Sequence, residues 1–301
     1  AMTALQSLNQ TNKEMLVTQN RVSTGYRVND ASDNAAYWSI ATTMRGDRSA
    51  LSTVADALGL GSATAEIAAK GIESAIEIAG KIKDKLVAAR TPGVDRSKIQ
   101  SEIAELQESL KAVVDGASFN GQNWLKTDGS DATSTRTIVS SFSRAADGTI
   151  TIGTIEVDLD KTRLVDTDTS SSAGAILDTS ASLPNASSTN YTVLDLDIGS
   201  LTDSVEDLED LEAMLSTVDA AIESMTDAAT SLGAIKTRID IQKDFAQSLM
   251  DAIDTGVGQL VDADMNAEST RLQALQVRQQ LGIQALGIAN QSANMILRLF
   301  Q

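Results

Sequence analysis

The stretch that decides the fold is residues 51–86, LSTVADALGLGSATAEIAAKGIESAIEIAGKIKDKL. Its apolar or small residues alternate three and four positions apart without a break, at Leu51, Val54, Leu58, Gly61, Ala65, Ala68, Ile72, Ala75, Ala79, Ile82 and Leu86. This spacing places one narrow stripe on one face of a helix and is typical of a coiled-coil seam. The helix would be on the order of 50 Å long. Thr91-Pro92-Gly93 predicts where it ends, because Pro removes a backbone donor and Gly permits a turn.

Two further seams accompany this one. A second helix is predicted from Ile99, Ile103, Leu106, Leu110 and Val113, and a third begins with Leu211, Leu215, Val218, Ile222, Met225, Ala229 and Leu232. The third seam is expected to slip by one position and to resume at Ile235, Ile239, Gln242, Ala246, Leu249 and Ile253. Because a narrow apolar stripe must be buried against partner helices, these segments should form an antiparallel bundle.

Between residues 127 and 200 the apolar period changes to two, which predicts strands. The alternating residues are Ile150 and Ile152, then Ile155, Val157 and Leu159, and later Leu194, Leu196 and Ile198. Residues 166–192 contain 12 Ser or Thr, a composition that predicts an exposed loop. The fold class is therefore mainly α: an elongated antiparallel helical bundle or coiled-coil rod formed by the N- and C-terminal segments. A small β-rich insertion, expected to add nothing to the helical seams, interrupts it.

Composition excludes several kinds of chemistry. The chain has no Cys and no His, so thiolate catalysis, serine triads and ordinary zinc sites are ruled out. Its formal charge of −17 disfavours nucleic acid and anionic membranes as partners. Residues 279–297 carry no charge, but their Gln and Asn side chains argue against a membrane span. We therefore expect no enzyme activity, no cofactor, no nucleic acid and no membrane insertion.

Three local patterns have both a specific and a plain interpretation. Asp262, Asp264 and Asn266 begin like a calcium loop, but Ala267 stands where Gly is needed, so helix surface is favoured. Gly59 and Gly61 lie within a seam and predict a tight helix contact rather than a phosphate site. The acidic run from Asp203 to Glu212 is interpreted as the solvated first turns of the third long helix.

The two ends of the chain differ from the middle. Leu5, Leu8, Met15 and Val22 follow a helical repeat, and Gly25 is placed to end that helix. The uncharged C-terminal stretch is expected to be a helix buried among other protein helices. We predict a self-assembly interface formed by Leu5, Leu8, Met15 and Val22 from one end and Leu281, Leu286, Ile296 and Leu297 from the other.

Short motifs at both ends resemble those of bacterial flagellin, the subunit of the flagellar filament. They are Arg21-Val-Ser-Thr-Gly25, Asp33-Asn34-Ala-Ala36, Phe119-Asn120-Gly121 and Ala289-Asn290-Gln291. The resemblance covers about the first 125 and the last 100 residues, and many short motifs in the right order make it specific. The opening residues resemble the inside of that family's first helix, which predicts a native start further upstream.

The resemblance implies terminal helices in the core of a tubular homopolymer outside the cell, ordered on assembly. It divides the chain into a filament-core helix and connector (1–40), a first rod segment (41–126), an outer variable domain (127–200), a second rod segment (201–262) and a C-terminal core helix (263–301). Other subunits, the flagellar export apparatus, and hook-junction and cap proteins are the implied partners.

The sequence also allows two other functions. A hook-filament junction protein shares the terminal pattern but caps the filament instead of propagating it. An enzymatic or carbohydrate-binding module in residues 127–200 belongs to another class, and a ligand or turnover screen of that segment would identify it.

Overall fold

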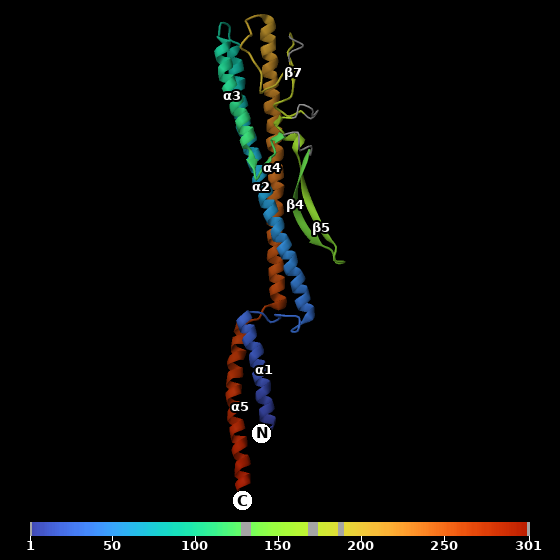
Figure 1. Ribbon diagram of the computed structural model, residues 1–301, viewed down its shortest axis with the longest axis vertical. Helices are drawn as coiled ribbons and strands as arrows, with labels where there is room; N and C mark the ends of the chain where they lie inside the picture. The colour runs from blue at the N-terminus through green and yellow to red at the C-terminus, as the bar shows by residue number, and fades with distance from the viewer. Residues whose placement is uncertain (1, 128–133, 168–173, 186–189, 300–301) are drawn as a thin grey trace. The chain divides into compact units, whose positions relative to one another are not determined.

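A computed structural model describes residues 2–127, 134–167, 174–185 and 190–299 (Figure 1); for Ala4 and residues 289–299 only the backbone is described. The chain divides into two compact units. One unit combines residues 1–50 with 248–301, and the other comprises residues 51–247 and is called the bundle below. Helices α2 (Ala35–Ala89) and α4 (Val205–Val261) contribute residues to both units.

The bundle is built from α2, α3 (Arg96–Gly116) and α4, which confirms the mainly helical fold class. Every seam residue predicted between Leu51 and Leu86 is buried. The helices α2 and α3 are joined through the predicted turn, where Gly93 has a φ of 78° and Asp95 caps α3 by accepting a hydrogen bond from the Ser97 amide. The heptad spacing alone was therefore sufficient to identify the core face of α2.

Contacts between α2 and α4 show one antiparallel register. Three pairs define it within the bundle: Lys83 with Asp219 at 2.5 Å, Glu66 with Lys236 at 3.4 Å, and Ser62 with Asp240 at 3.1 Å. The two residue numbers add up to 302 in each pair. A constant sum means that the two helices pass each other without a shift in register.

The slip expected in the third seam is wrong. The most buried apolar residues of α4 in the bundle are Leu211, Met214, Val218, Ala221, Met225, Ala228, Leu232, Ile239 and Ala246, while Ile235 and Gln242 are half-buried. These positions form one unbroken heptad pattern. The expectation failed because it placed Leu215, Ile222 and Ala229 on the seam, one residue later than Met214, Ala221 and Ala228. One residue turns the side chain by about 100°, and those three residues pack at the flank of the core.

Within the described residues, the strands form four two-stranded pairs. The longest pair is the antiparallel hairpin of β4 (Thr135–Arg144) and β5 (Ile150–Asp158), with a bulge between Val139 and Ser141. β1 (Ser118–Phe119) pairs with β2 (Gln122–Asn123), β3 (Lys126–Thr127) with β6 (Val165–Asp166), and β7 (Ala181–Ser182) with β8 (Asn190–Tyr191). The strand expected around Ile150–Val157 is confirmed. Leu159 begins a short 3₁₀ helix, Leu159–Lys161, and the strand expected at residues 194–198 is wrong.

The segment between the helices shares the core of the bundle, so the expectation that it adds nothing to the seams is also wrong. Ile138, Ile155, Leu177 and Tyr191 belong to one apolar cluster with the three helices. The loop expected over residues 166–192 thus contains buried side chains where it is described. Residues 194–198 lie along α3, because Gln107 donates to the Val193 and Leu196 carbonyls at 3.1 and 3.2 Å.

Two glycines of α2 allow the segment between the helices to approach α2 closely. A methyl group at Gly61 would come within 2.7 Å of Ile138 Cδ1, and one at Gly71 within 2.7 Å of Leu125 Cδ1. The tight helix contact expected at Gly59 and Gly61 is wrong: Gly61 packs closely against a strand, and a methyl group at Gly59 would meet no described atom within 4 Å.

The acidic run before and within α4 is not simply a solvated face. Asp203 pairs with Arg96 at 2.7 Å, and the side chain of Arg96 is nearly buried. Asp210 is buried and accepts a hydrogen bond from the Asn185 amide at 3.1 Å. These carboxylates therefore fasten the ends of α3 and of the inserted segment to α4.

The described helices contain no stretch that is long and apolar enough to cross a membrane.

Candidate assembly surface

The helices α1 (Met2–Thr24) and α5 (Met265–Leu299) lie side by side in the unit formed by the two chain ends (Figure 1). Their facing positions again alternate three and four residues apart. On α1 they are Leu8, Thr11, Met15, Thr18 and Val22, and on α5 they are Glu268, Leu272, Leu275, Gln279, Gly282 and Leu286. We call these two helices the terminal pair.

Side-chain contacts fix the terminal pair as antiparallel. Arg21 Nη1 lies 3.0 Å from Glu268 Oε1, and Gln279 Nε2 donates to Asn12 Oδ1 at 2.8 Å. Leu8 packs closely against Gly282, where a methyl group would come within 3.2 Å of Leu8 Cδ1. The seam of this pair therefore combines apolar side chains with Thr, Gln, Glu and Gly.

The family motif near the N-terminus forms the junction between helices. Gly25 has a φ of 77°, which favours glycine, and its carbonyl accepts from the Ala263 amide at 2.9 Å. Asp33 Oδ2 accepts from the Asn29 amide at 2.9 Å, and Asn34 Oδ1 caps α2 by accepting from the Tyr37 amide at 3.2 Å. These motif residues thus shape turns and helix ends, with Arg21 adding the ion pair to α5.

The same junction holds the end of α4. The amides of Arg27 and Val28 donate to the Val261 carbonyl at 2.7 and 3.2 Å, and Arg27 Nη2 donates to the Leu260 carbonyl at 2.9 Å. Hydrogen bonds of this kind satisfy carbonyls that a helix end leaves unpaired. A small apolar cluster of Val28, Ala41, Val257 and Val261 packs beneath them.

The second family motif lies in the bundle. Asn120 and Gly121 have φ values of 50° and 75° and connect β1 to β2 as a two-residue hairpin turn. Positive φ at both central positions is why Asn-Gly is preferred in such turns. Phe119 is half-buried on β1, while Asn123 Nδ2 donates to the Val114 carbonyl at 2.8 Å and so closes the end of α3.

The predicted assembly residues occupy two different environments. Met15 is buried, and Leu8, Val22 and Leu286 are half-buried; all four lie in the seam of the terminal pair. Leu5 and Leu281 are exposed, at 50% and 59%. The side chains of Asn290, Ile296 and Leu297 lie outside the described residues. A role of these residues in contacts between subunits stays a prediction.

Several residues of the terminal pair were not identified from the sequence. Val277 and Ile288 are exposed and, with Leu281, form a second apolar stripe on α5, on the side opposite the seam. We call these three residues the outer stripe. Their spacing of four and seven was visible in the sequence. The buried Thr11, Thr18 and Leu275 also carried the 3-4 spacing, but Thr was not counted as a seam residue.

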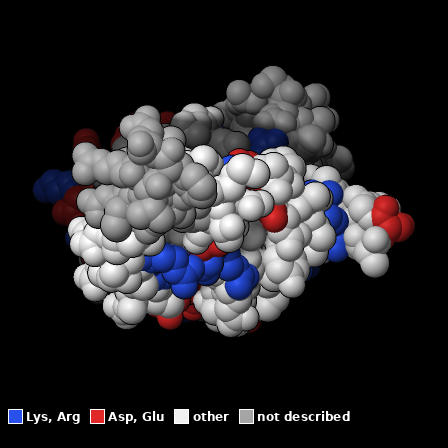
Figure 2. Space-filling view, turned by 90° about the horizontal axis from the view of Figure 1, so that it is seen from below, with Lys and Arg blue, Asp and Glu red and all other residues white. Residues whose placement is uncertain are grey.

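Charge is unevenly distributed on the surface. In the view of Figure 2, Lys and Arg side chains form separate small groups, and most of the visible described surface is uncharged. Uncharged surface of this kind can be buried by helix packing at a lower desolvation cost than charged surface.

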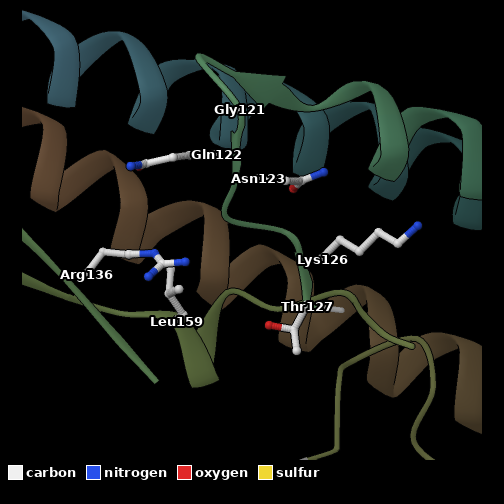
Figure 3. Close-up of a pocket in the computed structure, with 7 residues that line it drawn as sticks. All are labelled: Gly121, Gln122, Asn123, Lys126, Thr127, Arg136 and Leu159. Atoms are coloured by element: carbon white, nitrogen blue, oxygen red, sulfur yellow. The ribbon is translucent and has the colours of Figure 1, made fainter. Parts of the chain in front are cut away.

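The bundle contains a polar pocket of about 500 Å³, lined by Gly121, Gln122, Asn123, Lys126, Thr127, Arg136 and Leu159 (Figure 3). The side chains of Asn123 and Lys126 extend away from Arg136 in this view. Lys126 Nζ lies 2.6 Å from Asp115, so this cation forms an ion pair that stabilises the fold.

The calcium-like run is a helix cap. Asp264 caps α5 by accepting a hydrogen bond from the Asn266 amide at 2.9 Å. Within the described part of the chain, no group of three carboxylates is placed to hold a metal ion.

Comparison with known proteins points to one family. Residues 1–130 match the bacterial flagellin N-terminal helical region, and residues 215–300 match the bacterial flagellin C-terminal helical region. The chain is 48% identical to flagellin C of Rhizobium meliloti strain 1021 over 316 residues, covering all of this chain and 97% of the relative. It is 40% identical to a flagellin of Brucella melitensis over 302 residues, covering all of this chain and 96% of the relative.

Proposed function

Because the chain belongs to the bacterial flagellin family, it is a structural subunit of the extracellular flagellar filament, and we propose that the terminal pair forms its inner self-assembly surface. It is not an enzyme, and the junction-protein and carbohydrate-module alternatives are not favoured. The observation that supports the proposed surface is the presence of two apolar faces on α5. One face packs on α1, and the outer stripe has no cover among the described residues.

Free energy favours covering the outer stripe. Each apolar side chain of this size contributes roughly 1.5–3 kcal/mol when it passes from water to a packed interior. Val277, Leu281 and Ile288 are each more than half exposed, so most of that contribution is still available to a subunit contact. Leu5 on α1 would add to it. The seam residues Leu8, Met15, Val22 and Leu286 would act indirectly, by holding the two helices in the arrangement that presents this stripe.

The terminal pair also lacks a thick core of its own. Its fully or nearly buried side chains include Thr11, Thr18 and Glu268 beside Met15 and Leu275. Two helices with so little apolar burial are marginal in water. We propose that subunit contacts supply the missing stabilisation, so that folding of the two ends is completed on assembly.

Family membership supports further proposals about organisation and partners. We propose that residues 1–40 and 263–301 form the filament core, that 41–126 and 201–262 form the surrounding helical layer, and that 127–200 faces outward. The flagellar export apparatus, the hook-junction proteins and the cap protein are the proposed partners besides other subunits. Ile296, Leu297 and Asn290 are included in the proposed core because they continue α5 toward its end.

A single substitution tests the assembly surface. Leu281→Asp places a charge in the outer stripe, where burial without a partner would cost several kcal/mol per subunit. We expect no filaments in electron micrographs of the assembled protein, while circular dichroism of the monomer is unchanged. Gln276→Asp is the matched control, because it adds the same charge to a different exposed side of α5. Normal filaments from Leu281→Asp would contradict the proposed surface.

A further inference from the structure

Besides single residues such as Val87, the described part of the bundle exposes two groups of large apolar side chains that the terminal pair does not explain. On α4, Ile241 and Phe245 are 62% and 60% exposed. We call these two residues the α4 knob. The other place is a groove beside the β4–β5 hairpin, with exposed Leu60 and Val139 at its mouth and exposed Ile150 and Ile152 further along β5. Large exposed apolar side chains that cluster in this way mark interaction sites more often than scattered ones do.

The groove is a formed feature of the bundle. Its volume is about 230 Å³, and its walls come from α2, the β1–β2 turn and β4, including Ala57, Leu60, Ile138 and Val139. Trp124 also lines it, is almost fully buried, and has an indole Nε1–H without a hydrogen-bond partner in the described structure. An apolar cavity of about 150 Å³ is large enough for a benzene molecule. The groove therefore has room for one phenyl ring.

The α4 knob has a shape that fits this groove. Ile241 and Phe245 are one helical turn apart, about 6 Å along α4, so they project from the same side. On the hairpin, Ile152 pairs with Phe142, three residues beyond Val139 and therefore about 10 Å along β4. With Phe245 in the groove, Ile241 would lie within the apolar span that continues toward Ile152.

The knob and the groove lie at the same level of one bundle but on different elements. The register defined by Ser62 with Asp240 places Ile241 and Phe245 at the level of residues 61 and 57 of α2 along the helix axes. The groove is nevertheless lined from α2, β4 and the adjoining turn, while Phe245 remains largely exposed on α4. Phe245 is not among the residues that line the groove and is 60% exposed, so a Phe245 side chain that fills the groove would come from a second copy. Such a contact is heterologous, and when its rotation does not close it generates an open assembly such as a filament.

We propose that Phe245 of one subunit inserts into the Leu60–Val139 groove of a second copy and forms a subunit contact outside the terminal pair. The inference rests on the proposed filament function, because a second copy is the partner that every subunit in a filament meets. The contact would bury Phe245 and Ile241 against the hairpin of the neighbour, and aromatic anchors in pockets dominate interfaces of this type.

The absence of cysteine from the chain permits a clean cross-linking test. Two full-length variants, Val139→Cys and Phe245→Cys, are prepared separately and then mixed before assembly. After mild oxidation, we expect disulfide-linked dimers from mixed filaments and from neither variant alone, because each contact needs one cysteine from each copy. Val87→Cys, at another exposed apolar position of the bundle, replaces Val139→Cys in the control mixture and should give no dimer.

The results of this experiment distinguish failure of the proposed Phe245 contact from failure of filament assembly. Mixed filaments of normal appearance without cross-linked dimers would overturn the proposed contact and leave the terminal pair as the assembly surface. Failure of the unsubstituted protein to form filaments under the same conditions would instead count against the proposed function, and the contact would fall with it.

A second measurement covers the case in which a cysteine variant assembles poorly. We expect Phe245→Ala to raise the critical concentration for polymerisation about tenfold or more. Val87→Ala should leave it within about twofold, because its truncation removes a similar exposed apolar group elsewhere. A critical concentration for Phe245→Ala equal to that of the unsubstituted protein would overturn the proposal and assign the groove to a partner other than a second copy.

Discussion

The terminal pair and the bundle use the same 3-4 spacing with different contents. In the bundle, Leu58, Ile72, Ile82 and Leu86 are fully buried, and the inserted segment covers the helices from a further side. In the terminal pair the corresponding positions include Thr11, Thr18, Gln279 and Gly282, and only two helices face each other. Heptad spacing therefore predicts which face of a helix is turned inward, whereas side-chain volume and the number of covering elements decide how much stability results.

The largest expected effect comes from placing one charge in each region. Leu86→Asp puts an unpaired carboxylate into a fully buried position of the bundle, which should cost about 3–5 kcal/mol or more and remove the cooperative unfolding transition. Leu281→Asp, on the outer stripe, should change monomer unfolding by no more than about 0.5 kcal/mol. Urea unfolding followed by circular dichroism measures both. Similar losses of unfolding free energy in both variants would contradict the difference in burial between the bundle and the outer stripe.

Replacing a polar seam residue with Leu should lower stability in the bundle and raise it in the terminal pair. Gln107→Leu leaves the Val193 and Leu196 carbonyls without their donor, so we expect a loss of about 1–3 kcal/mol. Gln279→Leu removes one hydrogen bond to Asn12 but adds apolar volume to a thin seam, so the helical content of the monomer should rise. Circular dichroism and urea unfolding of the two variants give the signs. Equal signs would show that the terminal pair is already a complete core.

The helical part of the bundle could be predicted from the sequence because most of its seam residues are Leu, Ile, Val and Ala. The apparent slip arose where two adjacent positions, such as Met214 and Leu215, are both apolar, and only the register with α2 decides between them. The location of residues 194–198 could not be predicted, since alternating Leu194, Leu196 and Ile198 fit a strand as well as a segment that lies on α3. Its actual partners, Gln100 and Gln107, are about ninety residues away in sequence.

For the candidate site, the sequence predicted which helices matter but not which faces. Leu281 and Leu286 are equally apolar, yet one is exposed on the outer stripe and the other is half-buried in the seam. That assignment depends on which face of α5 is turned toward α1, and the long-range contacts of Arg21, Asn12 and Gly282 fix that face. The turn residues Gly25, Asn120 and Gly121 were easier to interpret, because positive φ has few alternatives to glycine and asparagine.

Two glycines of α2 should respond to substitution by Ala in opposite directions. Gly71→Ala would bring a methyl group to 2.7 Å from Leu125 and 2.9 Å from Ala117, so we expect a loss of about 1–3 kcal/mol. Gly80→Ala meets no described atom within 4 Å and should stabilise the helix by up to about 1 kcal/mol. Thermal unfolding distinguishes the two signs. Stabilisation by Gly71→Ala would mean that the inserted segment does not pack on α2 as described.

The smallest expected effects concern pH. The hydrogen bonds from Arg96 and Gly93 lower the pKa of Asp203, so its contribution to stability is present above its ordinary pKa and is lost as the pH falls through the lowered value. Burial raises the pKa of Asp178, so its ionised form costs stability at neutral pH, and acid relieves that cost. Asp203→Asn should therefore weaken the bundle at about pH 7, and Asp178→Asn should strengthen it. Urea unfolding midpoints test both signs.

Amide hydrogen exchange, compared between dilute monomer and assembled filaments, measures whether the two ends of the chain become ordered only on assembly. We predict that α2, α3 and α4 within residues 51–247 exchange slowly in both states, because their core is complete in one chain. The helices α1 and α5 should exchange quickly in the monomer and slowly in filaments, because neighbouring subunits cover the outer stripe only after assembly. Strong protection of α1 and α5 in the dilute monomer, equal to that of the bundle, would contradict the account.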